Sequence, residues 1–541
     1  MAGGNKNIQN ISAWMVRLAA LVALLSVPLS VIPNTIESYL PYDPESISRI
    51  AGIIIGIALF YVSSQLFRWK RVAYQMALVG IGLLITIEFL HSGYHLSLIL
   101  YAIIIALLIH DRHKYVVLSD FRVGSKIASS TFWALALLSL LVALSFFIID
   151  IRQFGIRLST FRSIQITIDA FLGRQIPSTL YVSPAAHILI DLIRYSVFLA
   201  LLSILYALFR PKGLATFASG FQSHRAARIL EAYSDSSEDY FKIWPTRNKH
   251  YFFYDDSFLC YGVKNNNAYV LDGCSGNSKN FNKLRESFVQ ECHINGWNPV
   301  VIHADEDEAG AWIPFGADKQ YIGSEAVVNI KEFMTIENNK HFRYVKNKAS
   351  SESLHVEFWQ APHTNEQIAS LRTISDTWLS SDRREYEFVM GYFDDNYLND
   401  CNIAVLYQNE KPIAFINFIP SYTHENLSID HMRFTKNIPS ISMHYLLLKS
   451  IEELHRHSIE TLNLGLAPLS KLSENSSTYS DKFLQVIKKI GRRYYSFDGL
   501  EQFKNKFEPE WEPRYIVYKG TPANLPHIIL GLNYLINFKD K

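Results

Sequence analysis

Residues 427–434 read LSIDHMRF, residues 442–457 read SMHYLLLKSIEELHRH and residues 460–464 read ETLNL. The two outer segments are short, partly apolar runs typical of strands, and the longer middle segment is typical of a helix. A strand, a helix and a second strand in this order indicate an α/β unit. These three segments therefore predict the fold of the C-terminal half of the chain.

The same alternation extends over residues 251–541 and indicates α/β units around a mixed sheet. The other strand candidates are Phe258–Val263, Ala268–Leu271, Pro299–His303, Ile403–Tyr407, Ile413–Ile419 and Tyr515–Tyr518. The other helix candidates are Lys279–His293, Glu366–Leu379 and Ser480–Ile490. Because this length suits two α/β modules, we predict one domain over residues 251–385 and a second, catalytic one over residues 386–541.

The N-terminal half contains a series of apolar runs, each close to the length of about 20 residues that a bilayer-spanning helix needs. The six runs are Ile11–Ile32, Ile50–Phe67, Val72–Leu90, Tyr94–His110, Thr131–Phe147 and Ala185–Phe209. They predict an α-helical membrane bundle of six transmembrane helices over residues 1–210. A juxtamembrane helix and linker would follow over residues 211–250.

Basic residues flank alternate runs, which predicts the orientation of such a bundle. They include Arg68, Lys70 and Arg71 after the second run, and Arg210 and Lys212 after the sixth. The loop over residues 150–184 also carries arginines and argues against this assignment. On balance we expect a multi-pass protein of the bacterial cytoplasmic membrane with its C-terminal domain in the cytoplasm.

The overall composition excludes several classes of protein. The chain has 541 residues with a formal net charge of +2, and 49% of its residues are hydrophobic and 19% charged, which excludes a disordered chain. Four cysteines exclude a disulfide scaffold. The sequence has no CxxC, HExxH, GxSxG or P-loop motif, so we predict no metal site and no cofactor.

Polar residues within the C-terminal half suggest acid–base chemistry and anion binding. Asp430 could orient or deprotonate a hydroxyl group. Arg433, Lys504, Lys506 and Arg514 could hold phosphate. In a regular strand Asp430 and Arg433 would face opposite sides, so a shared site requires a bulge between them. The alternative is a structural ion pair.

Three motifs in this half together resemble a known family. They are Asp430-His431-Met432-Arg433, Asn463-Leu464-Gly465-Leu466-Ala467-Pro468-Leu469-Ser470, and the segment from Phe503 to Tyr515, FKNKFEPEWEPRY. The chain resembles the bacterial aminoacyl-phosphatidylglycerol synthases, in particular phosphatidylglycerol lysyltransferases of the multiple peptide resistance factor type. Weaker matches at residues 323–327, 384–393 and 414–417 extend the resemblance over most of residues 251–520.

The resemblance implies a fold and a reaction. The fold is a pair of tandem acetyltransferase-like (GNAT) domains behind a membrane domain, and six spans would fit a short form without a complete flippase module. The reaction is transfer of an amino acid, with lysine expected, from aminoacyl-tRNA to the glycerol hydroxyl of phosphatidylglycerol in the inner leaflet. The partners would be aminoacyl-tRNA, phosphatidylglycerol and the lipid bilayer. The product would make the membrane less negative and weaken its attraction for cationic peptides.

The resemblance also suggests roles for individual residues. Asp430 and Arg433 would be catalytic, and the substrate-binding candidates are Lys504, Lys506, Arg514, His444, Asn463, Gly465 and Ser470. The basic run Lys488, Lys489, Arg492 and Arg493 would contact tRNA. His444 stands where relatives usually have an aspartate. If that aspartate binds the amino group, His444 would change the amino-acid preference or weaken the activity.

The loop over residues 433–442 argues against acetyl-CoA as the acyl donor. Acetyltransferases hold pyrophosphate on a glycine-containing loop that opens a helix, whereas this loop has no glycine and holds Ile438 and Ile441. Two further hypotheses remain. One is tRNA-dependent transfer to another acceptor, such as a peptidoglycan precursor. The other is a non-catalytic lipid-binding or transport protein, for which His444 is the best support.

Overall fold

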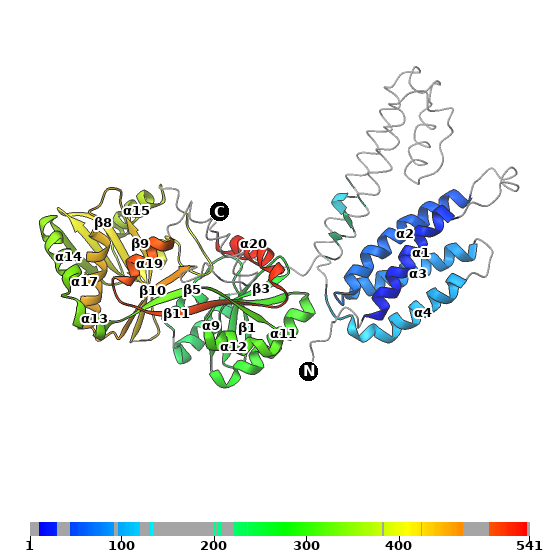
Figure 1. Cartoon of the computed structure of the whole chain (residues 1–541), viewed down its shortest axis with the longest axis horizontal. Coiled ribbons are helices and arrows are strands. Elements are labelled where there is room, and N and C mark those ends of the chain that lie inside the picture. The colour runs from blue at the N-terminus through cyan, green and yellow to red at the C-terminus, as the bar shows by residue number, and fades with distance from the viewer. Residues whose placement is uncertain are drawn as a thin grey trace, which may run out of the picture. The chain divides into compact units, whose positions relative to one another are not determined.

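The computed structural model describes residues 10–29, 44–90, 96–118, 220–234, 236–380, 384–423, 425–468 and 497–537, with a few isolated positions between residues 129 and 209. The chain divides into two compact units (Figure 1). The first unit comprises residues 1–213 and 293–296, and the second comprises residues 214–292 and 297–541.

The described part of the first unit contains four long helices that pack through small side chains. They are α1 (Ile11–Leu29), α2 (Pro44–Leu66), α3 (Arg71–Leu90) and α4 (Leu96–His110). Ala13 and Ala20 of α1 and Ala73 and Ala77 of α3 are buried in the shared core. A buried hydroxyl, that of Ser12, contacts Asp111 at 2.9 Å and so links α1 to the turn after α4.

The described helices correct the prediction of a membrane bundle. Across the described residues, none of the helices is both long and apolar enough to span a bilayer. A span takes about 20 consecutive apolar residues, whereas α4 has 15 residues. Charged residues also lie in the longer helices, among them Arg17 in α1 and Arg71 in α3. The six-helix membrane bundle and the multi-pass membrane location are therefore wrong, and the fifth and sixth predicted runs lie largely outside the described residues.

The second unit is an α/β structure. Its strands are β1 (His250–Tyr254), β2 (Ser257–Lys264), β3 (Asn267–Gly276), β4 (Asn298–Ala304), β5 (Asp318–Asn329), β6 (Leu354–Trp359), β7 (Asn402–Gln408), β8 (Lys411–Phe418), β9 (Asn426–Phe434), β10 (Thr461–Pro468) and β11 (Glu510–Tyr518). Its α-helices are α9 (Gly220–Tyr233), α10 (Tyr240–Ile243), α11 (Phe281–Asn295), α12 (Glu306–Trp312), α13 (Ile330–Ile336), α14 (Lys340–Ser351), α15 (Asn365–Leu379), α16 (Asp395–Asn399), α17 (Ser442–Arg456), α19 (Phe497–Asn505) and α20 (Leu525–Ile536).

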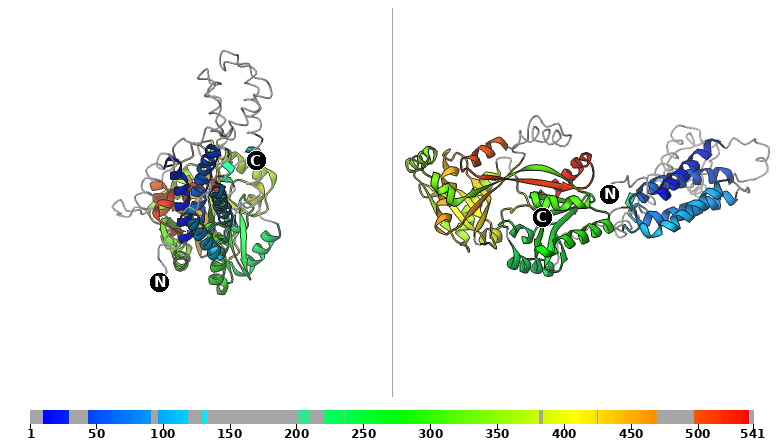
Figure 2. Two further views of the ribbon diagram at one scale, coloured as in Figure 1. Left: turned by 90° about the vertical axis from the view of Figure 1, so that its right-hand side faces the viewer. Right: turned by 60° about the horizontal axis from the view of Figure 1, so that its bottom comes forward.

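The strands form one mixed sheet in which the two halves of the unit exchange strands. The order is β1-β2-β3-β4-β11-β5-β10-β9-β8-β7-β6. Strand β11 lies between β4 and β5, and β5 lies between β11 and β10. Figure 2 shows β11, in red, running along β5, in green. The first half comprises β1 to β5 and the second comprises β6 to β11. The last strand of each half therefore pairs with strands of the other half: β11 with β4, and β5 with β10.

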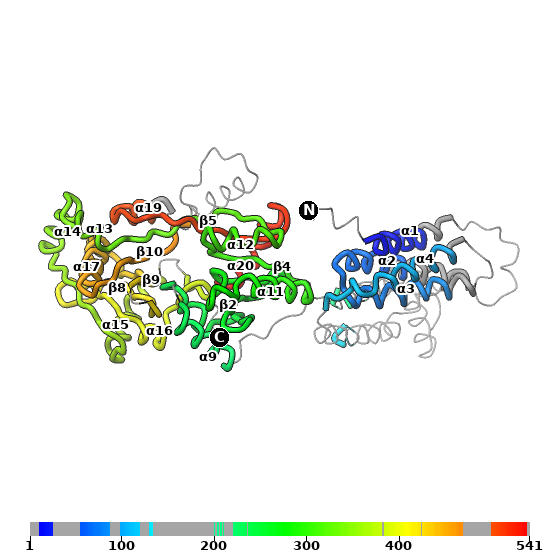
Figure 3. The backbone as a smooth tube through the Cα atoms, turned by 90° about the horizontal axis from the view of Figure 1, so that it is seen from below, coloured from blue at the N-terminus to red at the C-terminus, as the bar shows by residue number. Residues whose placement is uncertain are grey.

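The two halves repeat one arrangement, consistent with tandem GNAT-like α/β folds. In the first, the antiparallel strands β1, β2 and β3 are followed by α11 and then by β4, which pairs parallel to β3. In the second, β7, β8 and β9 are followed by α17 and then by β10, which pairs parallel to β9. Figure 3 shows α13, α14 and α17 on one face of β8 and β9, and α15 and α16 on the other.

The predicted strand–helix–strand unit of residues 427–464 corresponds to β9, α17 and β10. The apolar face of α17 is buried through Leu446, Leu447 and Ile451. The sequence patterns missed the strands β1, β5 and β6 and the helices α10, α12 to α14, α16, α19 and α20. The predicted helix Ser480–Ile490 lies outside the described residues. The proposed domain boundary at residue 385 stays a prediction, and the exchanged strands join the regions on its two sides.

Candidate functional site

Strand β9 contains the bulge that the sequence argument required. Ile416 of β8 pairs with Met432, whereas Phe418 pairs with Ile429, so β9 holds one extra residue in this interval. The side chain of Asn417 fills the irregularity, and its Oδ1 accepts a hydrogen bond of 2.8 Å from the His431 backbone N–H. The backbone N–H of His431 therefore has an acceptor within the bulge. The extra residue also changes the direction of the side chains that follow it.

The bulge brings Asp430 and Arg433 to the face covered by α15 and α16. The Asp430 carboxylate accepts a hydrogen bond of 2.8 Å from the Tyr397 hydroxyl of α16, and its side chain is 4% exposed. Burial raises the pKa of Asp430 to about 7, and the hydrogen bond from Tyr397 and the charge of Arg433 oppose that rise. A carboxyl group that titrates near neutral pH is suited to general acid–base chemistry.

Arg433 is buried and has a carboxylate partner other than Asp430. Its two terminal nitrogens donate to the two carboxylate oxygens of Glu385, each at 2.7 Å, and one also donates to Ser375. Its guanidinium lies 5.1 Å from the ring centroid of Trp378. The guanidinium is therefore fixed in the protein and close enough to Asp430 to influence that carboxyl group electrostatically.

A second polar cluster forms where the parallel strands β3 and β4 stop pairing. The last paired residues are Leu271 and Ile302, and the next residues, Asp272 and His303, have φ values of 58° and 64°. Non-glycine residues in this left-handed region cost about 1–3 kcal/mol each and are enriched at functional sites. His303 Nδ1 donates to Asp272 Oδ1 at 2.8 Å and so bridges the two strand ends.

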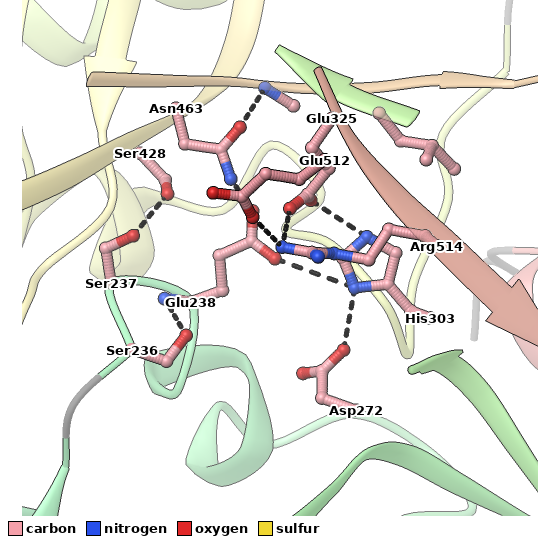
Figure 4. A network of polar contacts seen from close by, with 12 residues as sticks. Ser236, Ser237, Glu238, Asp272, His303, Glu325, Ser428, Asn463, Glu512 and Arg514 are labelled. Atoms are coloured by element: carbon pink, nitrogen blue, oxygen red, sulfur yellow. Dashed lines mark hydrogen bonds and ion pairs between the residues drawn. The ribbon is translucent and has the colours of Figure 1, made fainter. Parts of the chain in front are cut away.

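The corresponding end of β9 and β10 faces the same cluster. Their parallel pairing ends at Ser428 and Asn463. Figure 4 shows Glu238 between Asn463 and His303. Asn463 Nδ2 donates to Glu238 Oε1 at 3.2 Å, and His303 Nδ1 lies 3.8 Å from Glu238 Oε2. The Ser237 and Ser428 hydroxyls are 2.5 Å apart. Glu238 therefore joins the strand ends of both halves.

Glu325 on the exchanged strand β5 completes this network. Its carboxylate lies 2.8 Å from His303 Nε2 and 2.5 Å from an Arg514 terminal nitrogen, and its side chain is 2% exposed. Burial alone would raise the pKa of Glu325, but His303 and Arg514 outweigh it and lower the value to about 2. Burial and the charge of Glu325 raise the pKa of Glu238. The positively charged His303 and Arg514 thus bind the carboxylates of this network together.

The network also contains the one group of potential metal ligands found among the described residues. Atoms of Glu238, Asp272 and His303 lie within 4.8 Å of one another. However, both ring nitrogens of His303 already pair with carboxylates, and these carboxylates raise the pKa of His303 well above its ordinary value. An imidazolium has no lone pair for a metal. These residues therefore fit an ion-pair network better than a metal centre.

Several predicted substrate-binding residues are held by contacts within the protein. Lys504 is 2% exposed and its Nζ donates to the backbone carbonyls of Gly465 and Leu466 at 2.7 and 3.1 Å. Burial lowers the pKa of Lys504 to about 8. Gly465 has a φ of 81°, which favours glycine, and its N–H donates to Asn463 Oδ1 at 2.8 Å. Arg514 pairs with both Glu325 and Glu512.

His444 and Lys506 lie in a different environment. The His444 ring packs against Phe503 and His341, with ring centroids 4.8 and 5.2 Å away. Burial, together with the charges of His341 and Lys506, lowers the pKa of His444 to about 4, so the ring is neutral at pH 7. Lys506 is exposed. No described contact joins Lys506 to Asp430 or Arg433. Ser470, Lys488, Lys489, Arg492 and Arg493 lie outside the described residues.

A known protein family matches the part of the chain that carries the motifs. The family model "Phosphatidylglycerol lysyltransferase, C-terminal" matches residues 227–518, more than half of the chain. The chain belongs to this phosphatidylglycerol lysyltransferase family. The motif-based resemblance is therefore confirmed, and the chain carries a transferase domain of the lysyltransferase type.

Individual relatives of the lysyltransferase family support the same assignment. Phosphatidylglycerol lysyltransferases from Staphylococcus xylosus and Bacillus subtilis are 31% and 29% identical over 267 and 277 residues. These matches cover 49% and 50% of this chain, but only 32% of either relative. The solved structure of L-PGS from Bacillus licheniformis is 26% identical, with a TM-score of 0.52 over 58% of this chain and 96% of that one.

The lysyltransferase domain contains polar residues that the motif analysis did not select. Asp272 follows the predicted strand Ala268–Leu271 and His303 ends the predicted strand Pro299–His303. Because the carboxyl ends of parallel strands meet at one sheet edge, this pair was within reach of sequence reasoning. Glu325 lies in the short match at residues 323–327. Glu238 and Tyr397 carry no such signal, because loop and helix residues distant in sequence reach the site only through the tertiary fold.

Proposed function

We propose that this chain transfers an aminoacyl group, with lysine as the expected amino acid, from aminoacyl-tRNA to the glycerol hydroxyl of phosphatidylglycerol. Membership of the lysyltransferase family supports this reaction. The observation that carries the catalytic part is the β9 bulge, which places a buried carboxyl group with a pKa of about 7 beside a fixed guanidinium.

The proposed chemistry is acyl transfer between two oxygens. The lipid hydroxyl oxygen attacks the ester carbonyl carbon and forms a new carbon–oxygen bond, while the bond to the tRNA ribose oxygen breaks. Asp430 takes the proton of the attacking hydroxyl, and that proton then passes to the departing ribose oxygen. The ester is already an activated donor, so no nucleotide hydrolysis is needed. Binding both reactants in register supplies much of the rate.

The charges around the site suggest how the substrates are held. Arg433, Lys504 and Arg514 already donate to acceptors within the protein. We therefore assign the lipid phosphate to the exposed Lys506, and to Arg433 an electrostatic effect on Asp430. Asn463 and Gly465 remain the candidates for the aminoacyl pocket, with Ser470 beside them in sequence, and the basic run from Lys488 to Arg493 remains the candidate tRNA contact.

The charge of the network does not select the amino acid by itself. Its carboxylates Asp272, Glu325 and Glu512 have His303, Arg514 and Lys242 as cationic partners, and burial and the charge of Glu325 raise the pKa of Glu238. Lysine is therefore expected from the family alone.

The assignment is tested by supplying the full chain with radiolabelled lysyl-tRNA and vesicles of phosphatidylglycerol and phosphatidylethanolamine. We expect label in a lipid extracted from these vesicles and none with phosphatidylethanolamine alone. Alanyl- and arginyl-tRNA supplied in parallel identify the preferred amino acid. Transfer of label to a peptidoglycan precursor instead would support the other acceptor, and no labelled product with any donor would contradict the proposal.

Gly391 offers a test of the close packing around Asp430. A Cβ at this position would overlap the Tyr397 ring and the Asp430 carboxylate. Gly391→Ala should therefore lower transfer at least ten-fold and destabilise the protein by about 1–3 kcal/mol, the usual cost of overpacking. Gly310→Ala in α12 is the matched control, because its Cβ would meet nothing within 4 Å. Equal activity of the two variants would contradict the packing argument.

A further inference from the structure

Behind the Asp430 carboxylate, the Tyr397 hydroxyl and the Asn417 side-chain amide form a continuous chain of hydrogen bonds. The Tyr397 hydroxyl donates to Asp430 Oδ2 at 2.8 Å, and the same hydroxyl accepts a hydrogen bond of 3.1 Å from Asn417 Nδ2. The direction of this chain is fixed, because Asn417 Oδ1 already accepts the His431 N–H. With its oxygen engaged there, Asn417 can present only its NH₂ group to Tyr397.

The two side chains that form these hydrogen bonds are completely enclosed by protein. Tyr397 and Asn417 are both 0% exposed. The Tyr397 ring packs against Tyr240 and Trp244, with centroids 6.0 and 5.2 Å away. Tyr397 also lies near the start of α16, where the Asp394 side chain accepts its backbone N–H. The hydroxyl is thus held in place by the packing of the ring and by the backbone hydrogen bond.

We propose that Tyr397 is a positioning residue that, backed by Asn417, orients the Asp430 carboxyl group and sets the pH range in which it accepts a proton. This inference rests on the proposed role of Asp430. It adds that the useful ionisation state of the carboxylate is maintained by a hydrogen bond from α16, an element that is distant in sequence from β9.

The other groups around Asp430 do not account for a pH dependence near neutrality. Burial keeps His431 neutral by holding its pKa well below the usual range, and it raises the pKa of the Cys401 thiol to about 12. Burial and the charge of Asp430 also raise the pKa of Tyr397 itself well above its ordinary value. The remaining charged groups facing the carboxyl are the paired Arg433 and Glu385.

Tyr397→Phe is the direct test, because it removes the hydroxyl and keeps the ring. The hydrogen bond from Tyr397 lowers the pKa of Asp430, so its loss should raise that pKa and move the acidic limb of the kcat/KM profile to higher pH, by about one unit. We expect roughly ten-fold lower kcat at pH 6, recovery above pH 8 and little change in KM. Tyr240→Phe is the matched control, since its hydroxyl donates to Asp400 instead.

The outcomes separate this inference from the proposed function. A profile of Tyr397→Phe that coincides with wild type, or that falls by one factor at every pH, would overturn the positioning role. If the wild-type chain gives no labelled lipid, the proposed function fails, whereas full transfer by Asp430→Asn would remove only the role of Asp430. A readout independent of activity is the difference in melting temperature caused by Asp430→Asn, followed against pH with and without Tyr397→Phe. Its midpoint should move to higher pH when the hydroxyl is absent.

Discussion

Replacing Asp430 by asparagine should abolish aminoacyl transfer and, at the same time, raise the melting temperature of the protein above pH 7. General-base catalysis typically contributes about 10²–10⁴-fold, and a loss of this size is expected in kcat. Stability should move in the opposite direction, because burial raises the pKa of the carboxyl to about 7. The folded protein binds a proton there that the unfolded chain releases near pH 4, so stability falls as the pH rises between these values.

Asparagine has a similar shape but no charge, so it removes this destabilisation. The gain in melting temperature should therefore be largest at pH 8 and small at pH 4. Asp400→Asn is the control, because Asp400 accepts a hydrogen bond from Tyr240 outside the proposed catalytic pair. An inactive Asp430→Asn with no gain in stability at pH 8 would indicate that the carboxylate is better compensated than its burial suggests. Full activity would remove Asp430 from the mechanism.

Glu325→Gln should destabilise the lysyltransferase domain by about 3–5 kcal/mol, as expected when one partner of a buried ion network is removed. The substitution leaves His303 and Arg514 without the carboxylate that both contact at the junction of the exchanged strands. Because His303 and Arg514 lower the pKa of Glu325 to about 2, the stabilisation is present above the ordinary carboxyl pKa and is lost only as the pH falls toward 2. The penalty should consequently persist throughout the neutral range.

Chemical denaturation at pH 6 and pH 8 would measure this penalty. Glu306→Gln is the matched control, since Glu306 pairs with Lys319 at the surface and its loss should have little effect. A comparable small change for Glu325→Gln would show that the network contributes little to folding. Melting should also report on both halves together, because β5 and β11 are shared between them.

The local patterns were sufficient where a segment forms one regular element with nearby partners. The strand, helix and strand of residues 427–464 follow from apolar periodicity, and the corresponding elements are β9, α17 and β10. Strand β5 was missed, although it carries Glu325, because it pairs with β10 and β11, more than a hundred residues later in the chain. Apolar length alone also led to the wrong prediction of a membrane bundle, which the described helices do not support.

The sequence by itself determined the α/β class of the C-terminal half, the family, and Asp430 and Arg433 as residues of interest, because motifs and periodicity are local properties. Only the tertiary structure decided the partners of these residues. Arg433 pairs with Glu385, Asp430 with Tyr397, and Glu238 lies between the strand ends of the two halves. The physical reason is that a bulge and an exchange of strands are set by pairing between distant segments, and these pairings fix which charges are buried together.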